Sequence, residues 1–93
     1  MNKQSLIKSL TKKYPKIGIM ADGNGWIPKS PDSFVISAED GIMDNRGYDM
    51  FNYWTQNHTY YEFGVSTELT EYLDKNGWYC QWVNPGVVAL YKN

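Results

Sequence analysis

The sequence predicts an α+β fold: a small antiparallel or mixed β-sheet of about four strands with two α-helices packed on it. The last third of the chain carries the strongest evidence, because residues 60–65 predict a strand, 66–75 a short helix and 78–91 a β-hairpin. Apolar residues at helical spacing near the N-terminus predict the other helix. The 93 residues fit a single domain, over 1–93, with one modest core.

The first helix is predicted over residues 5–14. Ser5 is a suitable N-cap, and Pro15 disfavours a helical conformation in the residue before it. Four apolar side chains form one narrow stripe at helical spacing: Leu6, Ile7, Leu10 and Tyr14.

Two short strands are expected next. Residues 16–20 are β-prone, and residues 33–38 alternate so that Phe34 and Ile36 share one face. The following stretch, 42–57, contains a strong turn signal at Asp44-Asn45-Arg46-Gly47 but no decisive periodicity.

The second helix has clear ends. Ser66 or Thr67 can cap its start, and Asn76-Gly77 is typical of a left-handed C-terminal cap. Glu71 and Lys75 stand four residues apart in the favourable order for an ion pair. The predicted buried stripe consists of Leu69, Tyr72 and Leu73.

In the hairpin that follows, Trp78, Cys80 and Trp82 share one strand face. Pro85-Gly86 suits a type II turn, which separates the strands of a two-residue hairpin. A longer loop or a β-bulge is therefore expected.

Charge is distributed unevenly, although the net charge is only −1. Residues 1–16 carry five lysines and no acid, whereas residues 17–93 carry four basic and ten acidic side chains, a formal −6. The basic face of the first helix, represented by Lys8, Lys12 and Lys13, either packs against the protein's own acidic surface or binds an anionic partner.

Aromatic residues are concentrated in the second half of the chain. Of the fifteen, twelve lie between Tyr48 and Tyr91. They must supply much of the core, and those left at the surface are candidates for a binding face. Tyr48, Trp54 and Tyr61 are the aromatic candidates for that surface.

Motifs for enzyme or metal chemistry are weak. Cys80 and His58 form the available nucleophile and base pair, but a thiol in the middle of a strand among tryptophans is usually inert. A lone histidine rules out the usual zinc ligand sets. Turn formation explains the cluster of Asp40, Asp44 and Asp49 better than a metal site does.

The turn-forming segment 22–25, Asp-Gly-Asn-Gly, begins like a calcium loop and fails at Trp26. No catalytic residue, no metal site and no cofactor is therefore predicted.

No apolar run approaches the ~20 residues that span a bilayer, and the N-terminus lacks the apolar stretch of a signal peptide. One cysteine allows no internal disulfide. A cytoplasmic location and no membrane association are therefore expected.

Three short pieces of residues 39–91 carry a family resemblance. They are the Asp40-Gly41 turn followed by Phe51-Asn52-Tyr53-Trp54, then Phe63-Gly64-Val65 before a helix, then Gly77-Trp78-Tyr79 leading into Trp82-Val83-Asn84-Pro85-Gly86. Together they resemble small uncharacterised proteins of bacterial phages and other mobile elements. The resemblance implies a bacterial accessory protein and assigns no activity or site residue.

The leading functional prediction is a non-enzymatic protein-binding or modulator module that uses aromatic and acidic surface. The alternative is nucleic-acid binding through the basic N-terminal helix, although a single arginine and a pI of about 5.7 argue against it. A second alternative, a small-ligand or metal-dependent enzyme, has no motif to support it.

Overall fold

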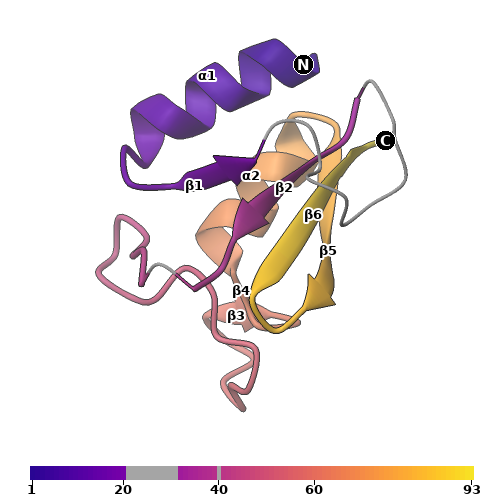
Figure 1. The fold of residues 1–93 in the computed structure, drawn as a ribbon. Helices are drawn as coiled ribbons and strands as arrows, with labels where there is room; N and C mark the ends of the chain where they lie inside the picture. Colours follow the sequence, from indigo (N-terminus) through magenta and orange to yellow (C-terminus); the bar gives the residue numbers. More distant parts are fainter. Residues whose placement is uncertain (21–31, 40) are drawn as a thin grey trace.

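The computed structural model describes residues 1–20, 32–39 and 41–93 (Figure 1). It confirms the predicted α+β fold, with a radius of gyration of 12.1 Å. The elements, in chain order, are α1 (Lys3–Lys13), β1 (Gly18–Met20), β2 (Phe34–Ser37), β3 (Tyr61–Glu62), β4 (Val65–Ser66), α2 (Thr67–Lys75), β5 (Trp78–Asn84) and β6 (Val87–Lys92).

The main sheet has four antiparallel strands in the order β1-β2-β6-β5. Phe34 of β2 is paired with Leu90 of β6, and Leu90 is paired on its other side with Cys80 of β5. Strands β3 and β4 form a separate two-stranded hairpin. Among the described strands, β1 and β5 stand at the two edges of the main sheet.

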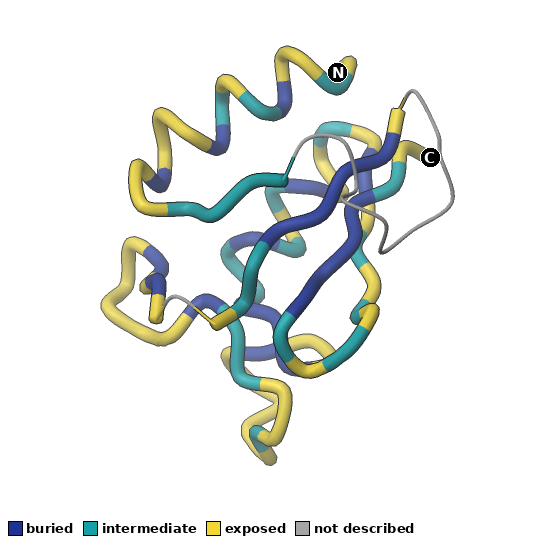
Figure 2. Tube along the Cα trace, viewed as in Figure 1, coloured by how far each residue is buried: buried dark blue, intermediate teal, exposed yellow. Residues whose placement is uncertain are grey.

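Both helices contribute to one core on one face of this sheet. The strand alternation places Phe34, Ile36, Trp78, Val88 and Leu90 on that face, and all five are buried. Figure 2 shows the buried colour running along β2 and β6. The helices add Leu6, Leu10, Leu69 and Leu73, which are fully buried.

Helix α1 begins two residues earlier than the sequence predicts. Asn2, not Ser5, is the N-cap, because the Asn2 side chain accepts a hydrogen bond from the Ser5 backbone N–H at 2.8 Å. Tyr14 is the C-cap, and its N–H donates to the Leu10 carbonyl at 2.7 Å. The end of the helix before Pro15 is as predicted.

The single strand predicted over residues 60–65 is wrong. The chain reverses at Phe63-Gly64, where both residues have positive φ, 51° and 80°, and β3 pairs with β4 across this turn. Two consecutive residues at positive φ are typical of a type I′ hairpin turn. The apolar run contains both short strands and hides the turn between them.

The predicted second helix and the C-terminal hairpin are confirmed, although Tyr72 of the predicted buried stripe is only half-buried. Helix α2 ends at its C-cap Asn76, and Gly77 follows with φ of 81°. The hairpin of β5 and β6 has an irregular register between Trp82 and Asn84, as expected for a bulge. Ser66 is the N-cap of α2, but its side chain makes no capping hydrogen bond.

Residues 41–60 are mostly irregular and form exposed loops (Figure 2). The predicted turn after Asp44 is present: the Gly47 N–H donates to the Asp44 carbonyl at 3.1 Å. Met50 is fully buried, and its backbone is held by Ile42 and Ser66. The turn predicted at 22–25 lies outside the described residues.

Candidate functional site

A groove of about 660 Å³ lies between α2 and β5. Its apolar lining includes Leu73 of α2 with Trp78 and Cys80 of β5. Strand β3 contributes Glu62, and the β3–β4 turn contributes Phe63. All of its residues from the main sheet belong to β5, so the groove lies at the edge of that sheet. The other lining residues are Val65, Thr70, Glu71, Asp74, Tyr79, Gln81 and Trp82.

Among the described lining residues, three are exposed carboxylates: Glu62, Glu71 and Asp74. Helix α2 places Glu71 and Asp74 on neighbouring positions three residues apart. Lys75 does not form the ion pair with Glu71 that the sequence suggests. The ion pair found among the described residues joins Arg46 and Asp44. None of the described lining residues is a lysine or arginine, so this part of the groove has an acidic character that suits a cationic ligand.

Cys80 lies in the lining of the groove. Burial raises the pKa of its thiol to about 11, with the charge of Glu62 as a second cause, so the thiol is protonated at neutral pH. His58 lies in the exposed loop before β3, and no hydrogen bond joins these two described residues. The geometry therefore lends no support to a Cys–His pair.

An aromatic patch lies beside the groove. We define it by four residues: Tyr53, Trp54, Phe63 and Trp82. The Tyr53 ring contacts Trp54 and Trp82 edge to face, with centroid distances of 4.8 and 4.9 Å. Trp82 and Phe63 also line the groove, so the two surfaces are continuous.

Two members of the aromatic patch are almost fully exposed. Phe63 has a relative exposure of 85% and Trp54 of 77%. The left-handed conformation of Phe63, with φ of 51°, is uncommon for a bulky residue. The Phe63 carbonyl accepts a 2.5 Å hydrogen bond from the Trp82 indole N–H, which fixes the turn against β5.

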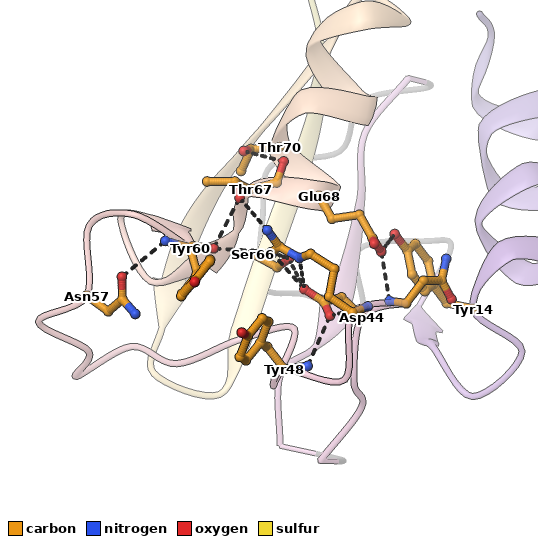
Figure 3. A network of polar contacts seen from close by, with 11 residues as sticks. Tyr14, Asp44, Tyr48, Asn57, Tyr60, Ser66, Thr67, Glu68 and Thr70 are labelled. Carbon is orange, nitrogen blue, oxygen red and sulfur yellow. Dashed lines mark hydrogen bonds and ion pairs between the residues drawn. The ribbon is translucent and has the colours of Figure 1, made fainter.

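A polar network holds the loop that precedes the aromatic patch (Figure 3). The Asp44 carboxylate is buried and accepts hydrogen bonds from Ser66 Oγ at 2.6 Å and from Arg46 Nη2 at 2.8 Å. It also accepts from the backbone N–H groups of Arg46 and Tyr48. Burial opposes ionisation of Asp44, but the hydrogen bonds from Ser66 and Arg46 outweigh it and lower its pKa.

The same network reaches α1 through Glu68. Its carboxylate accepts from the Tyr14 hydroxyl at 2.5 Å and from the Asn45 N–H at 2.9 Å. Burial of Tyr14 and its hydrogen bond to Glu68 raise the pKa of this phenol. Loop 41–50, the start of α2 and the end of α1 are thus joined by side chains (Figure 3).

These contacts make Asp44 a structural residue. Asp49 is exposed, and Asp40 lies outside the described residues. Among the residues described, no group of three or more His, Cys, Asp or Glu side chains is arranged to hold a metal ion.

The basic candidates Lys8, Lys12 and Lys13 are exposed on α1. In the described part of the chain, none of them forms an ion pair with a carboxylate, so close pairing with the protein's own acids is not observed. Lys13 Nζ instead lies 5.0 Å from the centroid of the Tyr72 ring.

The aromatic candidates have three different environments. Trp54 is exposed and belongs to the aromatic patch. Tyr48 is 40% exposed but stacks on Tyr60 with a centroid distance of 4.7 Å, and both rings cover the Arg46 guanidinium. Tyr61 is only 8% exposed, so its assignment to the surface is wrong.

The six sequence-predicted candidates do not form one site. Helix α1 lies at the top of Figure 1, whereas the loop carrying Trp54 lies at the bottom. Sequence reasoning missed Phe63, Glu62, Glu71 and Asp74. The Phe-Gly dipeptide was the available signal, since glycine favours a turn and a turn exposes its neighbour.

Comparison of the chain with protein-family models, with curated protein sequences and with solved structures found no match. Across the described residues, no helix is long and apolar enough to cross a membrane.

Proposed function

We propose that this small compact α+β domain is a non-enzymatic protein-binding module. It engages a macromolecular partner through the aromatic patch and the acidic groove beside it. The observation that carries the proposal is the exposure of Phe63 and Trp54, 85% and 77%, next to a groove lined by three carboxylates.

Large aromatic side chains in water favour burial by a partner. Each such ring can remove about 150–250 Å² from water, and tryptophan is among the residues most enriched at the energetic centre of protein interfaces. The Phe63 backbone adds a second argument, because left-handed conformations in bulky residues concentrate at functional positions. Carboxylates around aromatic anchors supply charge selectivity.

The resemblance of residues 39–91 to small proteins of phages and mobile elements supports a more specific role. In this proposal the domain acts in the bacterial cytoplasm as a modulator of a host protein. A single cysteine, which cannot form an internal disulfide, is consistent with a reducing compartment.

Affinity capture from bacterial lysate, followed by calorimetry with the purified captured protein, tests the proposal. The double variant Trp54→Ser, Phe63→Ser should lose the captured protein, whereas Met43→Ser should retain it. Met43 is a suitable control because it is also an exposed apolar residue, at 52%, and lies outside the aromatic patch. Equal capture by all three proteins would contradict the proposal.

Nucleic-acid binding through α1 is the second candidate. It is favoured by the exposure of Lys8 and Lys12 and by the absence of an ion pair from either to a described acid. The expected signature is affinity for DNA or RNA that falls steeply with salt and is lost in the double variant Lys8→Gln, Lys12→Gln.

A further inference from the structure

Strand β5 is an open edge of the sheet. Among the described strands it pairs only with β6, in the order β1-β2-β6-β5, and its seven residues make it the longest of them. Its other side meets the groove, whose second wall is α2. An edge strand beside a helix is an arrangement to which an extended peptide can add as a further strand.

The register of β5 with β6 determines which main-chain groups of β5 face this open edge. The Asn93 N–H donates to the Gly77 carbonyl at 2.9 Å, which marks these two residues as a hydrogen-bonded pair. Antiparallel pairs alternate, so the pairs of Tyr79 with Tyr91 and of Gln81 with Ala89 are also hydrogen-bonded.

It follows that the N–H and C=O groups of Trp78, Cys80 and Trp82 point away from β6. The pairing of β6 with β2 agrees with this assignment. The Ala38 N–H donates to the Gly86 carbonyl at 2.8 Å, so these two residues form a hydrogen-bonded pair. By the same alternation, the main-chain N–H and C=O of Val88 face β2 and not β5. Within the described residues, no further backbone hydrogen bond reaches Trp78, Cys80 or Trp82.

The edge also lacks the usual protection against strand addition. Proteins commonly place charged residues, proline or a bulge on exposed edges. Residues 78–82, Trp-Tyr-Cys-Gln-Trp, contain neither a charge nor a proline, and the irregular register begins only after Trp82.

We propose that an extended peptide segment of the partner, with basic side chains at alternate positions, adds to β5 as a new edge strand. Its main chain pairs with Trp78, Cys80 and Trp82. Its lysine or arginine side chains face Glu62, Glu71 and Asp74, which have no basic neighbour among the described residues of the groove lining. This inference rests on the proposed function and specifies the chemistry of the ligand and its mode of binding.

Synthetic peptides test this directly. The probes are end-capped peptides with lysine or arginine at alternate positions and apolar residues between them. We expect binding that protects the amide hydrogens of Trp78, Cys80 and Trp82 from exchange. The amides of Tyr79 and Gln81 already bond to β6 and serve as internal controls.

Two matched comparisons separate strand addition from charge attraction alone. N-methylation of the peptide amides that face β5 should abolish binding, whereas N-methylation of the alternate amides should not. The double variant Glu71→Gln, Asp74→Asn should weaken binding about fivefold. Glu39→Gln with Asp49→Asn removes the same charge outside the groove and should leave affinity unchanged.

The outcomes distinguish this inference from the proposed function. Peptide binding without amide protection on β5, or with equal effects of both methylation patterns, would overturn strand addition. Strand addition would be overturned as well if no peptide binds, or if a second copy of the chain occupies the edge and forms a dimer. The capture experiment with Trp54→Ser, Phe63→Ser decides the proposed function independently of these results.

Discussion

At the scale of single residues, two glycines hold positive φ in different surroundings. Gly77 has φ of 81°, with no atom within 4 Å of where a Cβ would stand. Gly64 has φ of 80°, and its Cβ would lie 2.8 Å from the Asn52 carbonyl oxygen. An alanine at position 77 would therefore have only the cost of a left-handed conformation, whereas an alanine at position 64 would also clash with the backbone of Asn52.

We predict that Gly77→Ala lowers the free energy of unfolding by about 1–2 kcal/mol, the cost of a left-handed alanine. Gly64→Ala should cost clearly more, because the Asn52 backbone must also move, together with the bond from its N–H to the Gly64 carbonyl. Urea denaturation measures both. Equal losses would mean that the β3–β4 hairpin does not pack closely on residue 52.

Asp44 provides a prediction about pH. Asp44→Asn should lower the free energy of unfolding by about 1.5–3 kcal/mol at neutral pH, since it loses charge-assisted hydrogen bonds. Folding lowers the pKa of Asp44 below its ordinary value of 3.8, so its contribution is present above that value and is lost as the pH falls below it. The stability difference from the native protein should therefore shrink in acid.

Denaturation curves of both proteins across a pH series check this expectation. Asp49→Asn is the control, because it removes an exposed carboxyl from the same loop. A stability difference for Asp44→Asn that persists unchanged below the ordinary carboxyl range would contradict the assignment.

At the scale of elements, β5 has two faces with different roles. Trp78 is fully buried, contacts Phe34 edge to face at 5.7 Å and donates from Nε1 to the Met1 carbonyl at 2.8 Å. Tyr79, the next residue, is 43% exposed and stacks on Tyr91 on the other face.

Trp78→Ala should therefore cost about 3–5 kcal/mol of stability, the range for loss of a core aromatic. Tyr79→Ala removes one stacked pair and should cost only about 0.5–1.5 kcal/mol. Thermal or urea unfolding distinguishes them. Similar losses for the two variants would mean that the strand faces are assigned incorrectly.

The elements that were predicted correctly have sequence features that lie within the element itself. Helix α2 has a glycine at its end, and β5 alternates between large apolar and more polar residues, so propensity and periodicity agree with the structure. The hairpin of β3 and β4 was missed because both strands have two residues, too few for alternation to appear. Asn2 was missed as the N-cap of α1 because Ser5 is an equally good capping residue by type.

At the scale of the whole molecule, the site depends on contacts that are distant in sequence. The Trp82 ring contacts Tyr53, and Glu62 lines the same groove as Glu71 and Asp74 of α2. The spacing of these residues along the sequence does not predict that they lie close together. Trp54 and Tyr61 were both expected at the surface, but Trp54 is exposed whereas Tyr61 is buried by tertiary packing.

The central claim is that the aromatic patch and the adjoining acidic groove form a protein-binding surface. Its most direct test is calorimetric titration of the purified captured partner with the native domain, Trp54→Ser, Phe63→Ser and Met43→Ser. If each aromatic anchor contributes at least ~1 kcal/mol, the double variant should bind at least ~30-fold more weakly, while Met43→Ser binds like the native domain. An unchanged Kd in the double variant, with its fold intact, would contradict the claim.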